Sequence, residues 1–164
     1  MAGTQQVNEA LVLRIVTEFQ GYVRDLLDLA VATVVYGSGA TRHRATLASA
    51  ISSDRWIDRG NPHLDAVRKD AARLGIASLG SQLLVKNPKH DGDARLLKEL
   101  VELRNALAHD DRDKLRRLSR RGIRPTIGYV NVSQACLDRH ARALDRVVWD
   151  HLKGLFPATD PWSP

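Results

Sequence analysis

The sequence predicts an all-α protein, a single-domain antiparallel helical bundle with two long helices and several shorter ones. Apolar residues follow helical spacing at both ends of the chain and again near residue 100, and only residues 125–131 lean towards extended structure. A length of 164 residues fits one domain, and 43% hydrophobic with 27% charged residues is ordinary for a globular protein. We expect a helical domain over residues 6–156, disordered residues 1–5 and a proline-rich tail over 157–164.

The first long helix is predicted over residues 6–36, where the apolar stripe persists for about five turns. Gly37 and Gly39 then favour a turn over continued helix. A shorter helix over residues 42–51 follows, and residues 52–60 are expected to form a loop.

Capping signals define the next helix. Asn61 is suited to the N-cap, Pro62 to the first helical position and Gly75 to the C-cap. Residues 76–85 predict another short helix. Residues 87–93 are polar and rich in helix-breaking residues, so we expect a loop there.

The C-terminal third is predicted to hold a connector and the second long helix. The connector covers residues 112–124, with one helical turn at 114–118, and residues 125–131 are expected to be extended. Asn131 or Ser133 would cap the last helix. The apolar seam of that helix contains Leu137, Ala141, Leu144, Val148, Leu152 and Leu155.

The helix predicted over residues 96–110 carries the chemistry-bearing residues. One face is apolar, and the last turns hold Arg104, Asn105 and His109. A planar, always charged guanidinium suits a phosphate, and an imidazole suits proton transfer near neutral pH. Asn105 and His109 are four residues apart and share one face, whereas Arg104 and His109 lie about 140° apart around the helix. We interpret these three residues as a candidate site for a phosphate-containing substrate.

The Arg-x4-His spacing alone has little specificity. A second pair, Arg146 and His151, lies in the last helix. His109 has a simpler explanation as a helix C-terminal histidine favoured by the helix dipole. Arg104 has one as a surface ion pair with Glu99 or Asp110.

The segment after His109 is strongly basic. Residues 112–124 contain seven basic residues and one acidic residue, so the segment has a net charge of +6. This equals the net charge of the whole chain. Concentrated positive charge favours a polyanion partner, with a solvated surface turn as the alternative. The candidate RNA-binding residues are Arg112, Lys114, Arg116, Arg117, Arg120 and Arg121.

Other function classes have weak support. The single cysteine, Cys136, forms no pair, and the histidines have no H-x3-H spacing, so we expect no metal and no cofactor. No glycine-rich phosphate loop or nucleophile elbow is present, and aromatic residues are only 5% of the chain. No apolar run reaches membrane-spanning length and the N-terminus lacks a signal-peptide layout, so a cytoplasmic protein is expected.

Three segments resemble a known family. The run Leu103-Arg104-Asn105-Ala106-Leu107-Ala108-His109-Asp110 resembles the R-N-x3-H form of the Arg-x4-6-His motif of the HEPN superfamily. The block from Asn61-Pro62 through Asp65 and Asp70 to Arg73-Leu74-Gly75 is similar to a segment of its RiboL-PSP-HEPN-like branch. Residues 18–26 are similar to the first helix of that branch, and the resemblance spans most of residues 5–155.

The resemblance implies a metal-independent endoribonuclease that forms a homodimer. Arg104 and His109 of both subunits would face one RNA cleft, with Asn105 orienting the imidazole or the phosphate. It also implies a toxin or phage-defence role with an antitoxin or other inhibitory partner. Family toxins sometimes carry a modifiable tyrosine two residues after the histidine, where this chain has Asp111. The alternatives are a non-catalytic HEPN scaffold that binds RNA or a protein, and a regulatory helical dimer without nucleic acid.

Overall fold

A computed structural model describes residues 2–39, 42–59, 63–158 and 160–162. These residues form helices joined by turns, with no strand among them, which confirms the predicted all-α class. The helices are α1 (Ala2–Gly37), α2 (Arg44–Ser52), the 3₁₀ helix η1 (Trp56–Asp58), α3 (Leu64–Arg73), α4 (Leu79–Lys86), α5 (His90–Ala108), α6 (Arg112–Arg120) and α7 (Ile127–Leu155).

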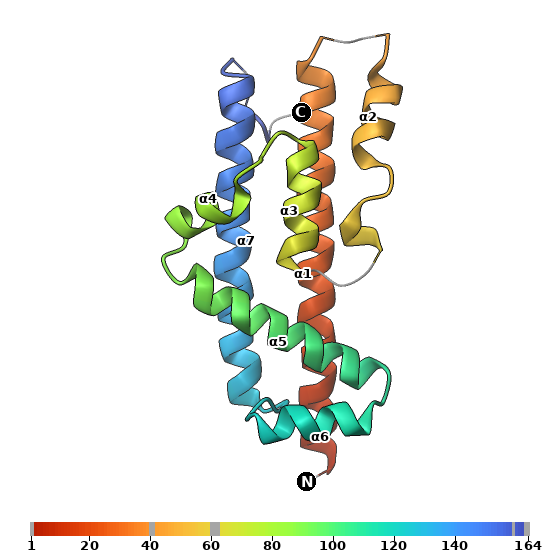
Figure 1. The fold of residues 1–164 in the computed structure, drawn as a ribbon, viewed down its shortest axis with the longest axis vertical. Helices are drawn as coiled ribbons and strands as arrows, with labels where there is room; N and C mark the ends of the chain where they lie inside the picture. Colours follow the sequence, from red (N-terminus) through yellow and green to blue (C-terminus); the bar gives the residue numbers. More distant parts are fainter. Residues whose placement is uncertain (1, 40–41, 60–62, 159, 163–164) are drawn as a thin grey trace.

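The two long helices, α1 and α7, lie side by side and run in the same direction (Figure 1). The antiparallel neighbours are α2, which returns along α1, and α6, which returns along α5. Helix α5 crosses both long helices at an angle and contacts each of them. The chain therefore covers the α1–α7 pair with the shorter helices that connect them.

The core lies where α1, α5 and α7 meet. Tyr22 of α1 also donates a hydrogen bond of 3.0 Å from its hydroxyl to the carbonyl of Ala141 in α7. Burial of one aliphatic side chain in this core stabilises the fold by about 1.5–3 kcal/mol. The seam predicted for the last helix is mostly confirmed, but Leu155 is exposed. The buried residues include Val12, Val16, Phe19, Val23, Leu27, Leu97, Leu100, Val101, Leu103, Leu144, Val147, Val148 and Leu152.

Three helices end in the same hydrogen-bonded turn, with a residue of positive φ just after the C-cap. Gly75 (φ 89°) follows α3, Gly122 (φ 82°) follows α6 and Asp110 (φ 46°) follows α5. After α3, Ile76 donates to the carbonyl of Ala71 over 3.1 Å, which is the 6→1 bond of a Schellman turn. The C-cap role predicted for Gly75 is confirmed, since this backbone conformation favours glycine.

The N-terminal residues differ from the prediction. Residues 2–5 were expected to be disordered but form the first turn of α1, and residue 1 lies outside the described residues. No proline interrupts this turn, and Gln5 donates a side-chain hydrogen bond of 2.8 Å to Glu9, one turn later. The predicted caps Asn61 and Pro62 also lie outside the described residues, and His63 occupies the N-cap position of α3.

Three segments predicted to be irregular are helical. Helix α5 begins at His90, inside the expected loop of residues 87–93, and α6 occupies most of the expected connector. Helix α7 begins at Ile127, inside the expected extended stretch, because Thr126 caps it in place of Asn131 or Ser133. The Thr126 hydroxyl accepts a hydrogen bond of 3.1 Å from the amide of Tyr129. Packing of the buried face of α7 outweighs the β propensity of residues 125–131.

The described residues of the C-terminal tail, 157–158 and 160–162, are not helical, as predicted, and the tail packs on α1. The hydroxyl of Thr33 donates to the carbonyl of Pro161 over 3.1 Å, and Pro161 is buried. A Cβ at Gly37 would lie 2.7 Å from the ring of Phe156. Gly37 therefore permits a close approach of the tail in addition to ending α1.

The block around residues 61–75 organises the loop that precedes α3. The buried carboxylate of Asp70 accepts hydrogen bonds of 2.9 Å from the amides of Trp56 and Ile57, the first turn of η1. Arg73 donates to the carbonyls of Ile51 and Ser53 at the end of α2. These two side chains have structural roles in this protein.

We expect Asp70→Ala to lower the free energy of unfolding by about 2–4 kcal/mol, because it leaves two amides without an acceptor. Asp65→Ala, on the exposed face of the same helix, should change it by less than about 0.5 kcal/mol. Urea unfolding followed by circular dichroism measures both. Equal effects of the two variants would contradict the capping role of Asp70.

Candidate functional site

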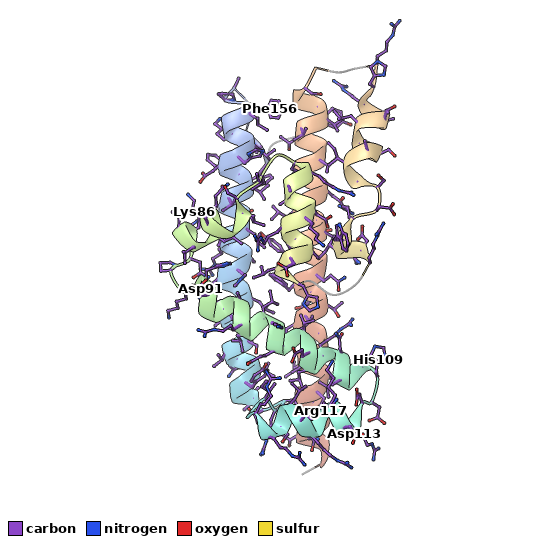
Figure 2. All side chains as sticks on the ribbon, viewed as in Figure 1. Lys86, Asp91, His109, Asp113, Arg117 and Phe156 are labelled. Atoms are coloured by element: carbon purple, nitrogen blue, oxygen red, sulfur yellow. The ribbon has the colours of Figure 1, made fainter. Side chains whose placement is uncertain are left out.

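The residues of the Arg-x4-His motif lie at the C-terminal end of α5. His109 is exposed and occupies the C-cap position, and Arg104 and Asn105 are half-buried in the last turns. Nη1 of Arg104 donates a hydrogen bond of 3.2 Å to Oδ1 of Asn105. Figure 2 shows His109 at this end of α5, next to α6 with Asp113 and Arg117. The three candidate catalytic residues are therefore grouped at one end of one helix.

Two aspartates build the turn that positions His109. The amide of Asp110 donates to Leu107 over 3.2 Å, and the amide of Asp111 donates to Ala106 over 2.9 Å, which closes a Schellman turn. Oδ1 of Asp111 then accepts from the amide of Lys114 over 2.9 Å and caps α6. The position where the family toxins carry a tyrosine is a helix cap here.

The two Arg-x4-His pairs have different environments. Nε2 of His151 lies 2.8 Å from the carbonyl oxygen of Leu74, and its ring lies 3.4 Å from a Cβ placed at Gly75, so this histidine helps to hold the α3 turn against α7. The imidazole of His109 forms no hydrogen bond or ion pair within the described part of the chain. Of these two histidines, His109 is exposed and His151 is half-buried.

The carboxylates considered as simpler partners of Arg104 pair with other cations. Glu99 lies 3.6 Å from Arg121 and Asp110 lies 3.7 Å from Arg112. The guanidinium of Arg104 instead contacts the neighbouring amide of Asn105.

The basic segment after His109 is helix α6, and acidic neighbours offset part of its charge. Arg112 pairs with Asp110, and Arg116 pairs with Asp113. Arg121 pairs with both Glu99 and Glu102. The other three predicted RNA-binding cations form no ion pair with any described residue. They are Lys114, Arg117 and Arg120.

A second basic surface was not predicted from the sequence. A groove of about 720 Å³ lies between η1, α3 and α5. Lys69 lies over the ring of Trp56, with Nζ 3.6 Å from the ring centroid, and Arg59 lies 5.5 Å from it. Residues of four separate segments, η1, α3, α4 and α5, line this groove, so no local spacing in the sequence indicates it.

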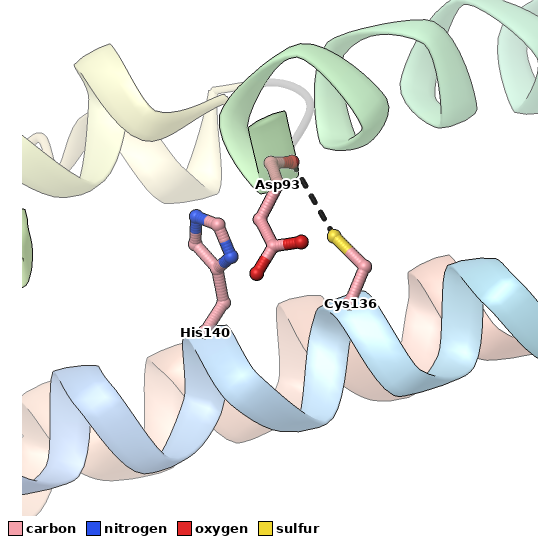
Figure 3. A group of neighbouring side chains, drawn as sticks. All are labelled: Asp93, Cys136 and His140. Carbon is pink, nitrogen blue, oxygen red and sulfur yellow. Dashed lines mark hydrogen bonds between the residues drawn. The ribbon is translucent and has the colours of Figure 1, made fainter. Parts of the chain in front are cut away.

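A buried polar cluster joins α5 to α7 (Figure 3). Asp93 of α5 faces Cys136 and His140 of α7, and the ligand atoms of the three side chains lie within 4.8 Å of one another. Arg139 donates two hydrogen bonds, of 2.5 and 2.8 Å, to the carboxylate of Asp93. Burial alone would raise the pKa of Asp93, but the hydrogen bonds from Arg139 and Asn87 outweigh it and hold this pKa below its ordinary value.

Burial controls the other two members of the cluster. It raises the pKa of the Cys136 thiol to about 12, with a further contribution from Asp93. It lowers the pKa of His140, as does the neighbouring His90. His140 is 1% exposed, and neither ring nitrogen has a hydrogen-bond partner among the described residues. A buried polar group without a partner costs about 1–3 kcal/mol, so this histidine is an unusual member of the core.

The sequence interpretation missed this cluster. The available signal was Cys136-x3-His140, which places a thiol and an imidazole on one helix face. Asp93 was not linked to them, because residues 87–93 were expected to form a loop.

No family model, curated protein or solved structure matches this chain. Within the described part of the chain, each helix is too short or too polar to cross a bilayer.

We expect the two aspartates after His109 to respond in opposite directions. Asp110→Gly should leave the free energy of unfolding unchanged or raise it by up to about 1 kcal/mol, because glycine adopts positive φ without strain. Asp111→Ala should lower it by about 1 kcal/mol, because α6 loses its N-cap. Chemical denaturation measures both variants. A loss of stability in Asp110→Gly would show that the Asp110 side chain itself stabilises the turn.

Proposed function

We propose that this protein is a homodimeric, metal-independent endoribonuclease of the HEPN type. The observation that carries the proposal is the environment of His109. Its imidazole is exposed at the end of α5, five residues after Arg104 and directly before a basic helix. The similarity of residues 103–110 to the HEPN motif supports the same function.

The proposed reaction is an internal phosphoryl transfer. His109 takes the proton of a ribose 2′-hydroxyl, and the 2′-oxygen attacks the adjacent phosphorus. The bond from phosphorus to the 5′-oxygen breaks, and that oxygen receives a proton from the second imidazole of the dimer. The products are a 2′,3′-cyclic phosphate and a 5′-hydroxyl. Acid–base catalysis of this kind contributes about 10²–10⁴-fold.

The reaction also needs a positive charge next to the phosphate, and an arginine supplies it. The crowded phosphate gains negative charge on its free oxygens, and a guanidinium can donate to two of them at once. Arg104 is already held by Asn105 over 3.2 Å, so this amide orients the guanidinium. We assign Arg104 to the phosphate and Asn105 to the positioning of Arg104.

Helix geometry supports the homodimer that the HEPN resemblance implies. On a regular helix, positions 104 and 109 project about 140° apart and are separated by about 7.5 Å of rise, so the two side chains point in different directions. A two-fold interface places the same patch twice, which lets Arg104 of one subunit face His109 of the other. The proposed site therefore contains two arginines and two histidines.

Helix α6 is the proposed RNA-binding surface. Lys114, Arg117 and Arg120 have no carboxylate partner among the described residues, so they are available to phosphates. A cytoplasmic toxin or phage-defence effector restrained by an inhibitory partner is the biological setting that we propose.

The direct test is cleavage of a labelled RNA by purified protein in excess EDTA. We expect His109→Ala to reduce the cleavage rate by about 10²–10⁴-fold and Arg104→Ala by about 10²–10³-fold, because they remove proton transfer and charge stabilisation, respectively. The matched controls are His43→Ala and Arg142→Ala, which change exposed residues of the same types at the N-cap of α2 and on α7.

Each outcome is informative. Cleavage by wild type and both controls, lost in both site variants, would support the assigned roles. Cleavage that persists in the site variants would overturn the site. No cleavage by a folded wild-type dimer would overturn the enzymatic proposal.

A non-catalytic scaffold is the second candidate, and one observation favours it. The guanidinium of Arg104 is half-buried and already hydrogen-bonded within the chain, which reduces its availability to a phosphate. A scaffold would bind RNA through α6 without cutting it, and His109→Ala would leave its binding intact.

RNA binding by α6 predicts a specific salt dependence. Replacing Arg117 and Arg120 with glutamine should weaken binding to single-stranded RNA and reduce the slope of log K against log salt by about 1.4, since each phosphate contact contributes about 0.7. The control replaces Arg142 and Arg146, two exposed arginines of α7, with glutamine. Fluorescence anisotropy at several salt concentrations measures the slopes. Equal slope changes in the two double variants would exclude α6 as the specific contact surface.

A further inference from the structure

The buried cluster between α5 and α7 has the composition of a metal site. We propose that Asp93, Cys136 and His140 bind one divalent transition-metal ion of the zinc class. The three side chains supply one oxygen, one sulfur and one nitrogen, and all three residues are buried. This proposal departs from the sequence prediction of no metal ligand.

The placement of the donors fits a tetrahedral ion after a small adjustment. Cys136 and His140 are one turn apart on α7, and Asp93 faces them from α5 (Figure 3). Tetrahedral zinc with bonds of about 2.0–2.3 Å holds its ligand atoms about 3.5 Å apart. The donors lie within 4.8 Å of one another, so rotation of side chains by about 1 Å brings them into range.

The ring of His140 is an independent observation that points to a ligand. It is 1% exposed, and neither nitrogen has a hydrogen-bond partner among the described residues. Buried polar side chains normally have partners. A metal ion bound next to the thiol and the carboxylate would give a nitrogen lone pair of His140 a partner.

Asp93 is held in the orientation that a ligand needs. Oδ2 accepts hydrogen bonds from Arg139 and Asn87, whereas Oδ1 accepts one bond, from Arg139. A carboxylate has about four acceptor positions, so Oδ1 retains capacity for a metal ion. Arg139 and Asn87 would then be the outer partners that orient a ligating carboxylate.

His90 lies beside the cluster and also lines the basic groove. Its ring centroid lies 5.4 Å from that of His140, and its buried Nδ1 also has no partner among the described residues. The ring forms part of the wall of the basic groove between η1, α3 and α5. His90 is therefore the residue that is shared by the surroundings of the cluster and the wall of the groove.

The donor set selects the class of ion. Thiolate and imidazole ligands favour zinc, cobalt and related ions over magnesium or calcium, which prefer oxygen ligands. Binding breaks the S–H bond of Cys136, releases its proton to solvent and forms the metal–sulfur bond, with no change of oxidation state. The thiol also gives up its hydrogen bond of 3.3 Å to the Asp93 carbonyl.

Cobalt(II) is the probe, because its spectrum reports both geometry and sulfur ligation. Chelator-treated, reduced protein is dialysed and titrated with CoCl₂. We expect visible bands of tetrahedral cobalt and a near-ultraviolet thiolate-to-cobalt band that saturate at about one ion per chain, and loss of both when Zn²⁺ is added. Cys136 is the only cysteine, so the thiolate band can come from no other residue.

Two variants and one control complete the test. Cys136→Ser should lose the thiolate band and bind cobalt at least about tenfold more weakly. His140→Leu should remain folded, because it removes a buried polar group without a partner, yet lose saturable binding and the rise in melting temperature that Zn²⁺ gives wild type. His43→Ala should behave as wild type, since His43 is exposed on another part of the chain.

Absence of a thiolate band in folded wild type, or unchanged Zn²⁺ stabilisation in His140→Leu, would overturn the proposal. RNA cleavage is assayed separately in EDTA. Failure of the metal site therefore leaves the ribonuclease proposal standing, and the reverse also holds.

Discussion

The ion pair between Asp93 and Arg139 fixes α5 on α7, and the rest of the structure depends on where α5 lies. Helix α5 closes the core over both long helices, forms one wall of the basic groove and carries Arg104, Asn105 and His109 at its far end. Because Asp93 is buried, loss of Arg139 would leave an uncompensated charge in the core. The polar contact at the start of α5 and the apolar contacts along it therefore determine together where His109 lies.

The segments that resemble the HEPN superfamily divide into two kinds. Asp70, Arg73 and Gly75 have structural roles, as cap and turn residues between α2, η1 and α3. His109 lies on the surface, and its imidazole forms no hydrogen bond or ion pair with the described residues. The same division separates the two Arg-x4-His pairs, because His151 holds the α3 turn. Burial and hydrogen bonding thus separate positions with a structural role from the candidate site position, where spacing does not.

The sequence predicted the long helices well, because apolar periodicity over many turns reflects burial directly. It also predicted Gly75, whose positive φ leaves few alternatives. It failed at the start of α7, where Thr126 caps a stretch of β-branched residues, and at α6, where a cap by Asp111 nucleates a highly charged helix. The cluster of Asp93, Cys136 and His140 needed the angle between α5 and α7, which local patterns do not contain.

The parallel arrangement of α1 and α7 has a consequence for synthesis of the chain on the ribosome. Helix α1, whose buried apolar residues include Val12, Val16 and Phe19, packs against α7, the helix that is made last. At about 5–20 residues per second, translation of residues 38–126 leaves α1 without α7 for roughly 4–18 s. A single amphipathic helix is marginally stable in water, so the nascent chain exposes a hydrophobic surface during this interval. Chaperone binding to α1 before release of the chain is the expected accompaniment of this topology.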